Sequence, residues 1–121
     1  MNKLVKAVSN EELIPEFLRS LNGILRLTDR ELDLMAMLIQ IDMDYDINSN
    51  EHKNVASTAN RKYIMRTLGI TKDNLSRYLK SFREKGILIS GPAEDELGVN
   101  RALIPNIIGD RLQLTIILKI K

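Results

Sequence analysis

The sequence contains no cysteine and a single histidine, His52. The lack of cysteine excludes disulfides, zinc sites built on thiolates, and cysteine nucleophiles. With one histidine, no Gly-rich phosphate loop and no cluster of zinc ligands, the usual acid–base and nucleophile sets cannot be assembled. We therefore expect no enzyme and no bound metal or cofactor.

Long apolar runs are also missing. No stretch of 18 or more apolar residues occurs, which argues against a membrane span, and the first residues, MNKLVKAVSNEEL, lack the apolar segment of a secretory signal. A length of 121 residues with 44% hydrophobic and 28% charged residues fits one compact globular domain. We expect a soluble intracellular protein with no membrane partner.

Positive charge, in contrast, is concentrated in residues 61–85. These 25 residues hold eight Lys or Arg and two acids, a balance of 8 − 2 = +6, whereas the rest of the chain holds ten basic and fourteen acidic residues, or −4. A basic surface on an otherwise acidic body favours a polyanionic partner, and DNA is the first candidate.

The same segment predicts two helices around a short turn. The first helix begins between Asn54 and Thr58 and ends at Gly69, which suits the left-handed position after a helix. Its expected inward residues are Ala59, Tyr63, Ile64 and Leu68. Ile70 is expected to pack inward across the turn, and Thr71 to cap the next helix.

The second helix is predicted from Lys72 to Lys85, before Gly86. At about 100° per residue, three apolar residues fall within one narrow arc and the polar residues lie away from it. The apolar arc consists of Leu75, Leu79 and Phe82; the outward residues are Asp73, Ser76, Arg77, Lys80, Ser81 and Glu84. One face packs and the other is free for recognition.

Two helices are expected upstream. Pro15 starts a short helix of about two turns, which Gly23 ends, and residues 2–8 form a terminal strand or arm. Thr28 and Glu31 fit a capping box, so a further helix follows from Glu31 to about Asp42. Its apolar residues cover more than half of the circumference, which places it at the centre of the domain.

The segment from Asp42 to Lys53 is polar and acidic, and we interpret it as a solvated connecting loop. Its alternating aspartates suggest calcium. However, an EF-hand loop requires glycine at its sixth position and glutamate at its twelfth, where this chain has Ile47 and Lys53. His52 has no second histidine or cysteine with which to share a metal. A metal site is therefore not expected.

Strands are expected after Gly86. Residues 87–90 (ILIS) and 99–104 (VNRALI) predict an antiparallel hairpin joined by a loop over residues 91–98. In residues 111–121, apolar side chains alternate with a mostly polar set, which predicts a half-buried terminal strand.

The order of these elements, and the segment RTLGITKDNLSRYLKSFREKGILI in particular, resembles the winged helix-turn-helix domains of transcription regulators and of phage and plasmid replication initiators. The resemblance covers residues 28–107. It implies an α+β, mainly helical fold with a β-hairpin wing, to which a terminal strand or strands are added. Residues 1–27 would form an N-terminal arm and short helix, residues 28–108 the winged core, and residues 109–121 the C-terminal strand. It also implies the cytoplasm of a bacterium or of a phage-infected host cell.

The resemblance further implies that helix 72–85 enters the major groove of double-stranded DNA, flanked by the wing. Candidate base contacts at its amino-terminal end are Asp73, Asn74, Ser76 and Arg77. Candidate phosphate contacts are Arg61, Lys62 and Arg66 on the preceding helix, with Lys72, Lys80 and Arg83. Arg101 on the second wing strand is either a surface strand residue or a minor-groove contact. For Tyr63 and Tyr78, half-buried packing is favoured over base stacking, since the chain has few aromatic residues.

One feature departs from a wing that grips DNA. The predicted tip carries Glu94, Asp95 and Glu96, which a phosphate backbone would repel. An alternative function is therefore a phage-type winged-helix adaptor that binds proteins through the acidic loop and wing. The two strand-like terminal segments could pair within one chain or between two chains, and we favour a homodimer because winged-helix regulators often bind two half-sites.

Overall fold

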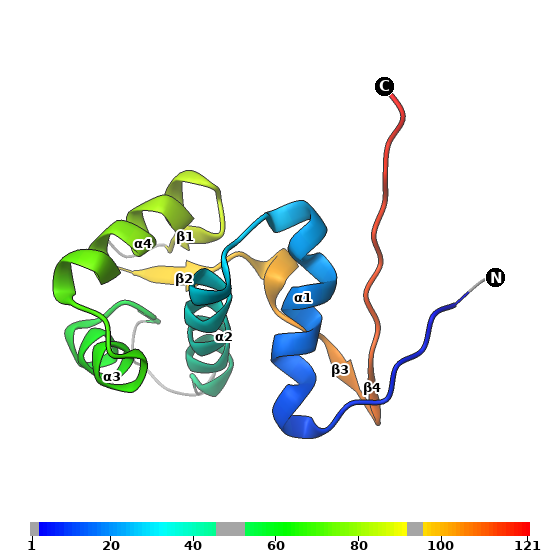
Figure 1. Ribbon diagram of the computed structural model, residues 1–121, viewed down its shortest axis with the longest axis horizontal. Coiled ribbons are helices and arrows are strands. Elements are labelled where there is room, and N and C mark those ends of the chain that lie inside the picture. Colours follow the sequence, from blue (N-terminus) through cyan, green and yellow to red (C-terminus); the bar gives the residue numbers. More distant parts are fainter. Residues whose placement is uncertain (1–2, 46–52, 92–95) are drawn as a thin grey trace.

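The computed structural model describes residues 3–45, 53–91 and 96–121, and within these ranges the fold is α+β and mainly helical. It contains four α-helices and two small antiparallel hairpins (Figure 1). The helices are α1 (Leu13–Leu25), α2 (Asp29–Asp44), α3 (Thr58–Leu68) and α4 (Lys72–Glu84). The strands are β1 (Leu88–Ser90), β2 (Leu97–Val99), β3 (Ile107–Ile108) and β4 (Arg111–Leu112). None of the helices in these ranges is long and apolar enough to cross a membrane.

Helix α2 is the centre of the domain. Figure 1 shows α1 and the β3–β4 hairpin on one side of α2, and α3, α4 and the β1–β2 hairpin on the other. The expected capping box is present: the Thr28 hydroxyl accepts from the Glu31 N–H at 3.2 Å, and the Glu31 carboxylate accepts from the Thr28 N–H at 3.0 Å. The side chains of α2 that face the core are fully buried: Leu34, Met35, Leu38 and Ile39. The prediction of a buried central helix is confirmed.

Helix α1 is longer than expected. Phe17, Leu18 and Leu21 are buried, but Gly23 lies inside the helix and does not end it. The helix ends instead at Leu25, and the next residue, Arg26, has a left-handed φ of 55°. The Asn22 side chain then bonds both the N–H and the carbonyl of Leu27, at 2.8 and 3.1 Å, which satisfies the backbone where the chain turns toward α2. These two hydrogen bonds stabilise the turn, which allows Arg26, a residue other than glycine, to adopt the left-handed conformation there.

The segment predicted as a loop over residues 42–53 begins later, because α2 continues to Asp44. Hydrogen bonds between Tyr45 and Asn54 link the two ends of the connection between α2 and α3. The Tyr45 hydroxyl donates to the Asn54 carbonyl at 2.7 Å and accepts from the Asn54 N–H at 3.2 Å. The rest of the acidic loop, including His52, lies outside the described residues.

The hairpin after α4 forms as predicted, but its second strand lies elsewhere than expected. Strand β1 pairs with β2 in the register Leu88 to Val99 and Ser90 to Leu97. The sequence predicts the second strand over residues 99–104, yet residues 101–103 form a 3-10 helix. The Asn100 side chain caps this helix by accepting from the Ala102 N–H at 3.0 Å.

At the N-terminus one of the two predicted alternatives is observed, whereas the C-terminal prediction needs correction. Residues 3–8 form no strand, so they are an arm, and Lys6 pairs with Glu16 of α1 at 3.0 Å. The predicted half-buried strand over residues 111–121 exists only as β4, two residues long, opposite β3. Residues 113–121 are exposed and extend away from the body of the domain (Figure 1). The apolar alternation predicts a half-buried strand, but the described residues cover only part of this face: Leu114 and Ile116 are 36% and 46% exposed, whereas Leu118 and Ile120 are 82% and 100% exposed.

Candidate nucleic-acid interface

The turn between α3 and α4 is built from three local devices. Gly69 adopts a φ of 64°, a left-handed conformation that glycine enters without a Cβ penalty, and its N–H bonds the Met65 carbonyl. Ile70 follows and is buried. The Thr71 hydroxyl then accepts from the Asn74 N–H at 3.2 Å and caps α4. All three were predicted, and together they fix where α4 begins relative to α3.

Helix α4 has one packed face and one exposed face. The apolar seam of Leu75, Leu79 and Phe82 is at most 3% exposed. The exposed residues of α4 lie outside this seam and are Lys72, Asp73, Asn74, Ser76, Arg77, Lys80, Arg83 and Glu84. The seam therefore fixes the rotation of the helix about its axis, and all four candidate base-contacting residues are directed away from the core.

Two of those four residues contact each other. A guanidinium N–H of Arg77 donates to the Asn74 side-chain oxygen at 3.0 Å, one helical turn away. This bond leaves the Asn74 amide N–H₂ and the remaining Arg77 donors available to a ligand. It also restricts both side chains, which lowers the entropy lost when they bind.

Five of the six candidate phosphate contacts are exposed and form no ion pair with any described residue. They are Lys62 and Arg66 of α3 and Lys72, Lys80 and Arg83 of α4. Arg61 differs, because its Nε donates to the carbonyl of Ala56, a buried residue, at 2.7 Å and supports the start of α3. Lys85 at the end of α4 also differs, with its ammonium 3.9 Å from the Glu31 carboxylate.

The outer face of α4 adjoins β1. Lys80, Arg83 and Glu84 line an open hollow together with the β1 residues Leu88, Ile89 and Ser90. The structure thus brings two candidate phosphate contacts next to the first strand of the hairpin. Ile89 and Ser90 are exposed beside them, so helix and strand present one continuous surface.

Arg101 occupies a different position from the predicted one. It lies in the 3-10 helix after β2, and its guanidinium is 3.3 Å from the carboxylate of Asp42. Asp42 is only 2% exposed, and Lys53 contacts the same oxygen at 3.0 Å. The second carboxylate oxygen accepts from the Val99 N–H at 3.0 Å. The role of Arg101 here is to pair with a buried acid of α2.

The burial of Asp42 was not predicted from the sequence, which placed this residue at the start of a solvated acidic loop. Its oxygens are occupied by two cations and a backbone amide, and no metal-binding cluster of acids occurs among the described residues. The available signal was helical periodicity. Asp42 follows the buried Leu38 by four residues and the buried Ile39 by three, which places it on the buried side of α2.

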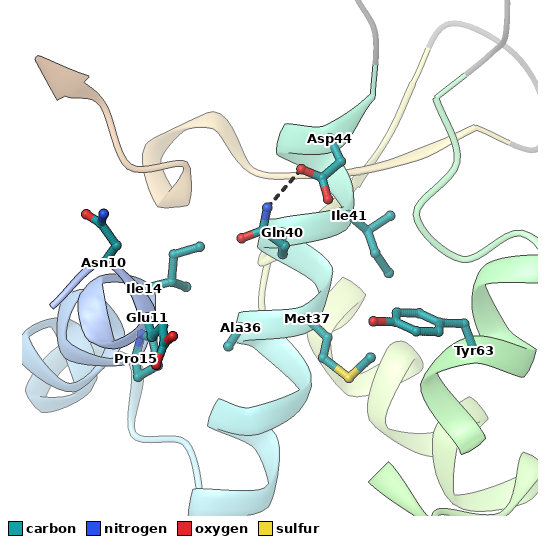
Figure 2. A pocket seen from close by; sticks show the side chains of 10 residues that line it. All are labelled: Asn10, Glu11, Ile14, Pro15, Ala36, Met37, Gln40, Ile41, Asp44 and Tyr63. Atoms are coloured by element: carbon teal, nitrogen blue, oxygen red, sulfur yellow. Dashed lines mark hydrogen bonds between the residues drawn. The ribbon is translucent and has the colours of Figure 1, made fainter. Parts of the chain in front are cut away.

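Tyr63 and Ala59 were expected to face the core, but both are exposed. Figure 2 shows Tyr63 reaching from α3 toward Met37 and Ile41 of α2, where it forms part of the wall of a groove of about 330 Å³. Ile64, one residue on, takes the buried position. The Tyr63 side chain therefore lies beside α2, while Tyr78 on α4 is half-buried as expected.

Of the acidic wing tip, only Glu96 belongs to the described residues; Glu94 and Asp95 lie outside them. The carbonyl of Glu96 accepts from the Gly91 N–H at 2.8 Å at the end of the hairpin. Comparison of the chain with protein-family models, with curated proteins and with solved structures finds no match in any of the three. A functional assignment must therefore depend on the residues of this surface.

Proposed function

We propose that the chain is a winged helix-turn-helix protein that binds double-stranded DNA sequence-specifically, as a transcription regulator or a replication initiator. The observation that carries the proposal is the exposed face of α4. Four of its outward residues, Lys72, Arg77, Lys80 and Arg83, are basic, and none of the four forms an ion pair with a described residue. Cations without partners on a helix held outward by a buried seam favour a polyanion.

Base recognition is assigned to the first turns of α4. In this mode of binding, the amino-terminal residues of the second helix of the motif reach base edges in the major groove. Arg77 has the planar donors for a bidentate contact to guanine, and Asn74 has the amide for a contact to adenine. Their mutual hydrogen bond keeps the two side chains together on the exposed surface.

Phosphate binding is assigned to residues on both sides of α4. Lys62 and Arg66 lie on α3, the helix that crosses the backbone in this type of domain. Lys80 and Arg83 border the hollow beside β1, where a backbone strand would run between helix and hairpin. These contacts give affinity and register, whereas the choice of sequence depends on Asn74 and Arg77.

Selection of bound duplexes from a random pool tests the proposal. We expect an enriched motif, and we expect Arg77→Ala to relax selection at one position while Lys80→Ala weakens binding to all duplexes alike. Lys3→Ala, which removes one exposed charge from the N-terminal arm, serves as the matched control and should change neither. Absence of any binding to DNA by the wild type would refute the proposal. It would favour the adaptor function, in which the acidic wing tip binds a protein.

A further inference from the structure

The C-terminal tail, defined as residues 113–121, has no strand partner within the described part of the chain. It carries five large apolar side chains that are between 36% and 100% exposed: Leu114, Ile116, Ile117, Leu118 and Ile120. No backbone hydrogen bond joins the tail to another described residue. An extended apolar segment with free N–H and C=O groups is a template for pairing with another strand.

The chain cannot supply that strand by extending its own hairpin. Strand β4 pairs with β3 in the register Ile107 to Leu112. Two positions further, Leu114 would stand opposite Pro105, which has no N–H to donate. The 3-10 helix over residues 101–103 precedes Pro105, so the backbone leaves the extended conformation there. The intrachain ladder therefore stops where the tail begins.

We infer that the tail pairs with the tail of a second copy of this chain, as two antiparallel strands related by a two-fold axis at Ile117. In this register Leu114 faces Ile120 of the other copy and Ile116 faces Leu118, so all four apolar residues lie on one face of the ribbon. Ile117 faces its counterpart on the other side. Such a contact uses the same patch on both copies and closes on itself.

Charge is compatible with this arrangement and disfavours two alternatives to it. Lys119 faces Thr115 and Lys121 faces Gln113, so no lysine opposes a cation. A parallel in-register pair would place each lysine opposite itself, and a shift of the axis to Ile116 would place Lys121 opposite Arg111. Like charges directly opposite each other destabilise a pair of strands. Because a two-stranded ribbon by itself is only marginally stable, the dimer should dissociate on dilution.

The inference is independent of DNA binding, because α4 and the tail lie on opposite sides of the domain (Figure 1). It can be tested without DNA. The absence of cysteine makes single-cysteine variants unambiguous reporters. Cα atoms of facing residues in an antiparallel pair lie within the range that a disulfide can span.

Under mild oxidation, Ile117→Cys should form a covalent dimer with itself. Leu114→Cys and Ile120→Cys should each remain monomeric alone, since their own counterparts would lie six residues away along the ribbon, about 20 Å. A mixture of the two should form a mixed disulfide, identified by its mass. Self-crosslinking of Leu114→Cys as fast as that of Ile117→Cys, or no crosslinking in the mixture, would overturn the inference.

Sedimentation of the native chain provides the second measurement. We expect the mass to approach twice 13.8 kDa as the concentration rises. Ile117→Lys should abolish this increase, since it places two ammonium groups face to face, and Asn106→Lys, with the same change of charge before β3, should not. Both substitutions are at exposed positions, so the thermal unfolding of the monomer serves as the folding control. A wild type that stays at 13.8 kDa at all concentrations would contradict the pairing.

Discussion

The buried carboxylate of Asp42 accepts a hydrogen bond from the backbone N–H of Val99 at 3.0 Å, joining α2 to β2 across 57 residues of sequence. The same carboxylate contacts Lys53 and Arg101. A backbone amide at the end of the hairpin and two cations from different segments thus converge on one side chain of the central helix. This contact fixes the hairpin relative to α2, and through β1 it positions the strand beside α4.

Asp42→Ala should therefore be strongly destabilising. It leaves the Val99 N–H buried without an acceptor and removes the partner of Lys53 and Arg101. Breaking a wholly buried ion pair costs about 3–5 kcal/mol, and we expect about 2–4 kcal/mol here because both cations retain access to water. Urea unfolding measures the change. Asp44→Ala, two residues on and exposed, is the control and should stay within about 0.5 kcal/mol of the wild type.

Gly23→Ala should stabilise the protein. Gly23 lies inside α1 with helical geometry, and a Cβ placed there would meet no atom within 4 Å. Alanine in a helix is favoured over glycine by about 0.5–1 kcal/mol. Thermal unfolding should shift upward accordingly. The sequence alone indicated that Gly23 ends the helix; if it did so in a left-handed conformation, the same substitution would lower the unfolding temperature.

Leu79→Ala and Lys80→Ala should separate stability from binding. Leu79 is 3% exposed in the seam beneath α4, and its truncation should cost about 2–5 kcal/mol of unfolding free energy. Lys80, the next residue, is exposed, and its truncation should change stability by less than about 0.5 kcal/mol while weakening DNA binding. Unfolding curves and binding isotherms on the same two proteins provide the comparison. Equal loss of stability in both variants would mean that the face of α4 assigned to DNA is in fact packed.

The N-terminal arm should respond to acid. Hydrogen bonds from Lys6 and then Arg19 hold the pKa of Glu16 below its ordinary value of 4.5. Because the folded-state pKa is lowered, the stabilising contact is present above pH 4.5 and is lost as the pH falls through the lowered pKa. An NMR titration of the Glu16 carboxyl carbon should show this lowered midpoint, and Lys6→Ala should raise it. An unchanged midpoint in that variant would show that the arm is not held at Glu16.

The sequence was most informative where local chemistry decides the structure. Thr28 with Glu31, Gly69, and Thr71 each act within one helical turn, and each device was predicted. Prediction failed where the outcome depends on distant residues. The burial of Asp42 requires cations 11 and 59 residues away in the sequence. The alternation in residues 111–121 predicts an apolar face, but it does not indicate which residues pack against that face.

In the candidate site, too, some features could be predicted from the sequence and others could not. The exposure of Arg77 and Lys80 follows from the period of the α4 seam, so it could be predicted from the sequence. Arg61 and Arg101 could not be distinguished from other surface arginines, because their acceptors, the Ala56 carbonyl and the Asp42 carboxylate, become available only through the fold. The structure therefore narrows the set of residues assigned to DNA contact.

The salt dependence of DNA affinity tests the central claim most directly. With five cations on phosphates, namely Lys62, Arg66, Lys72, Lys80 and Arg83, log K should fall with log salt at a slope of about −4.5. Replacing Lys80 by Ala should reduce the magnitude of the slope by about 0.9, and Lys3→Ala should leave it unchanged. A flat salt response, or a slope that the Lys80 variant does not alter, would contradict the account of α4 as the DNA-binding surface.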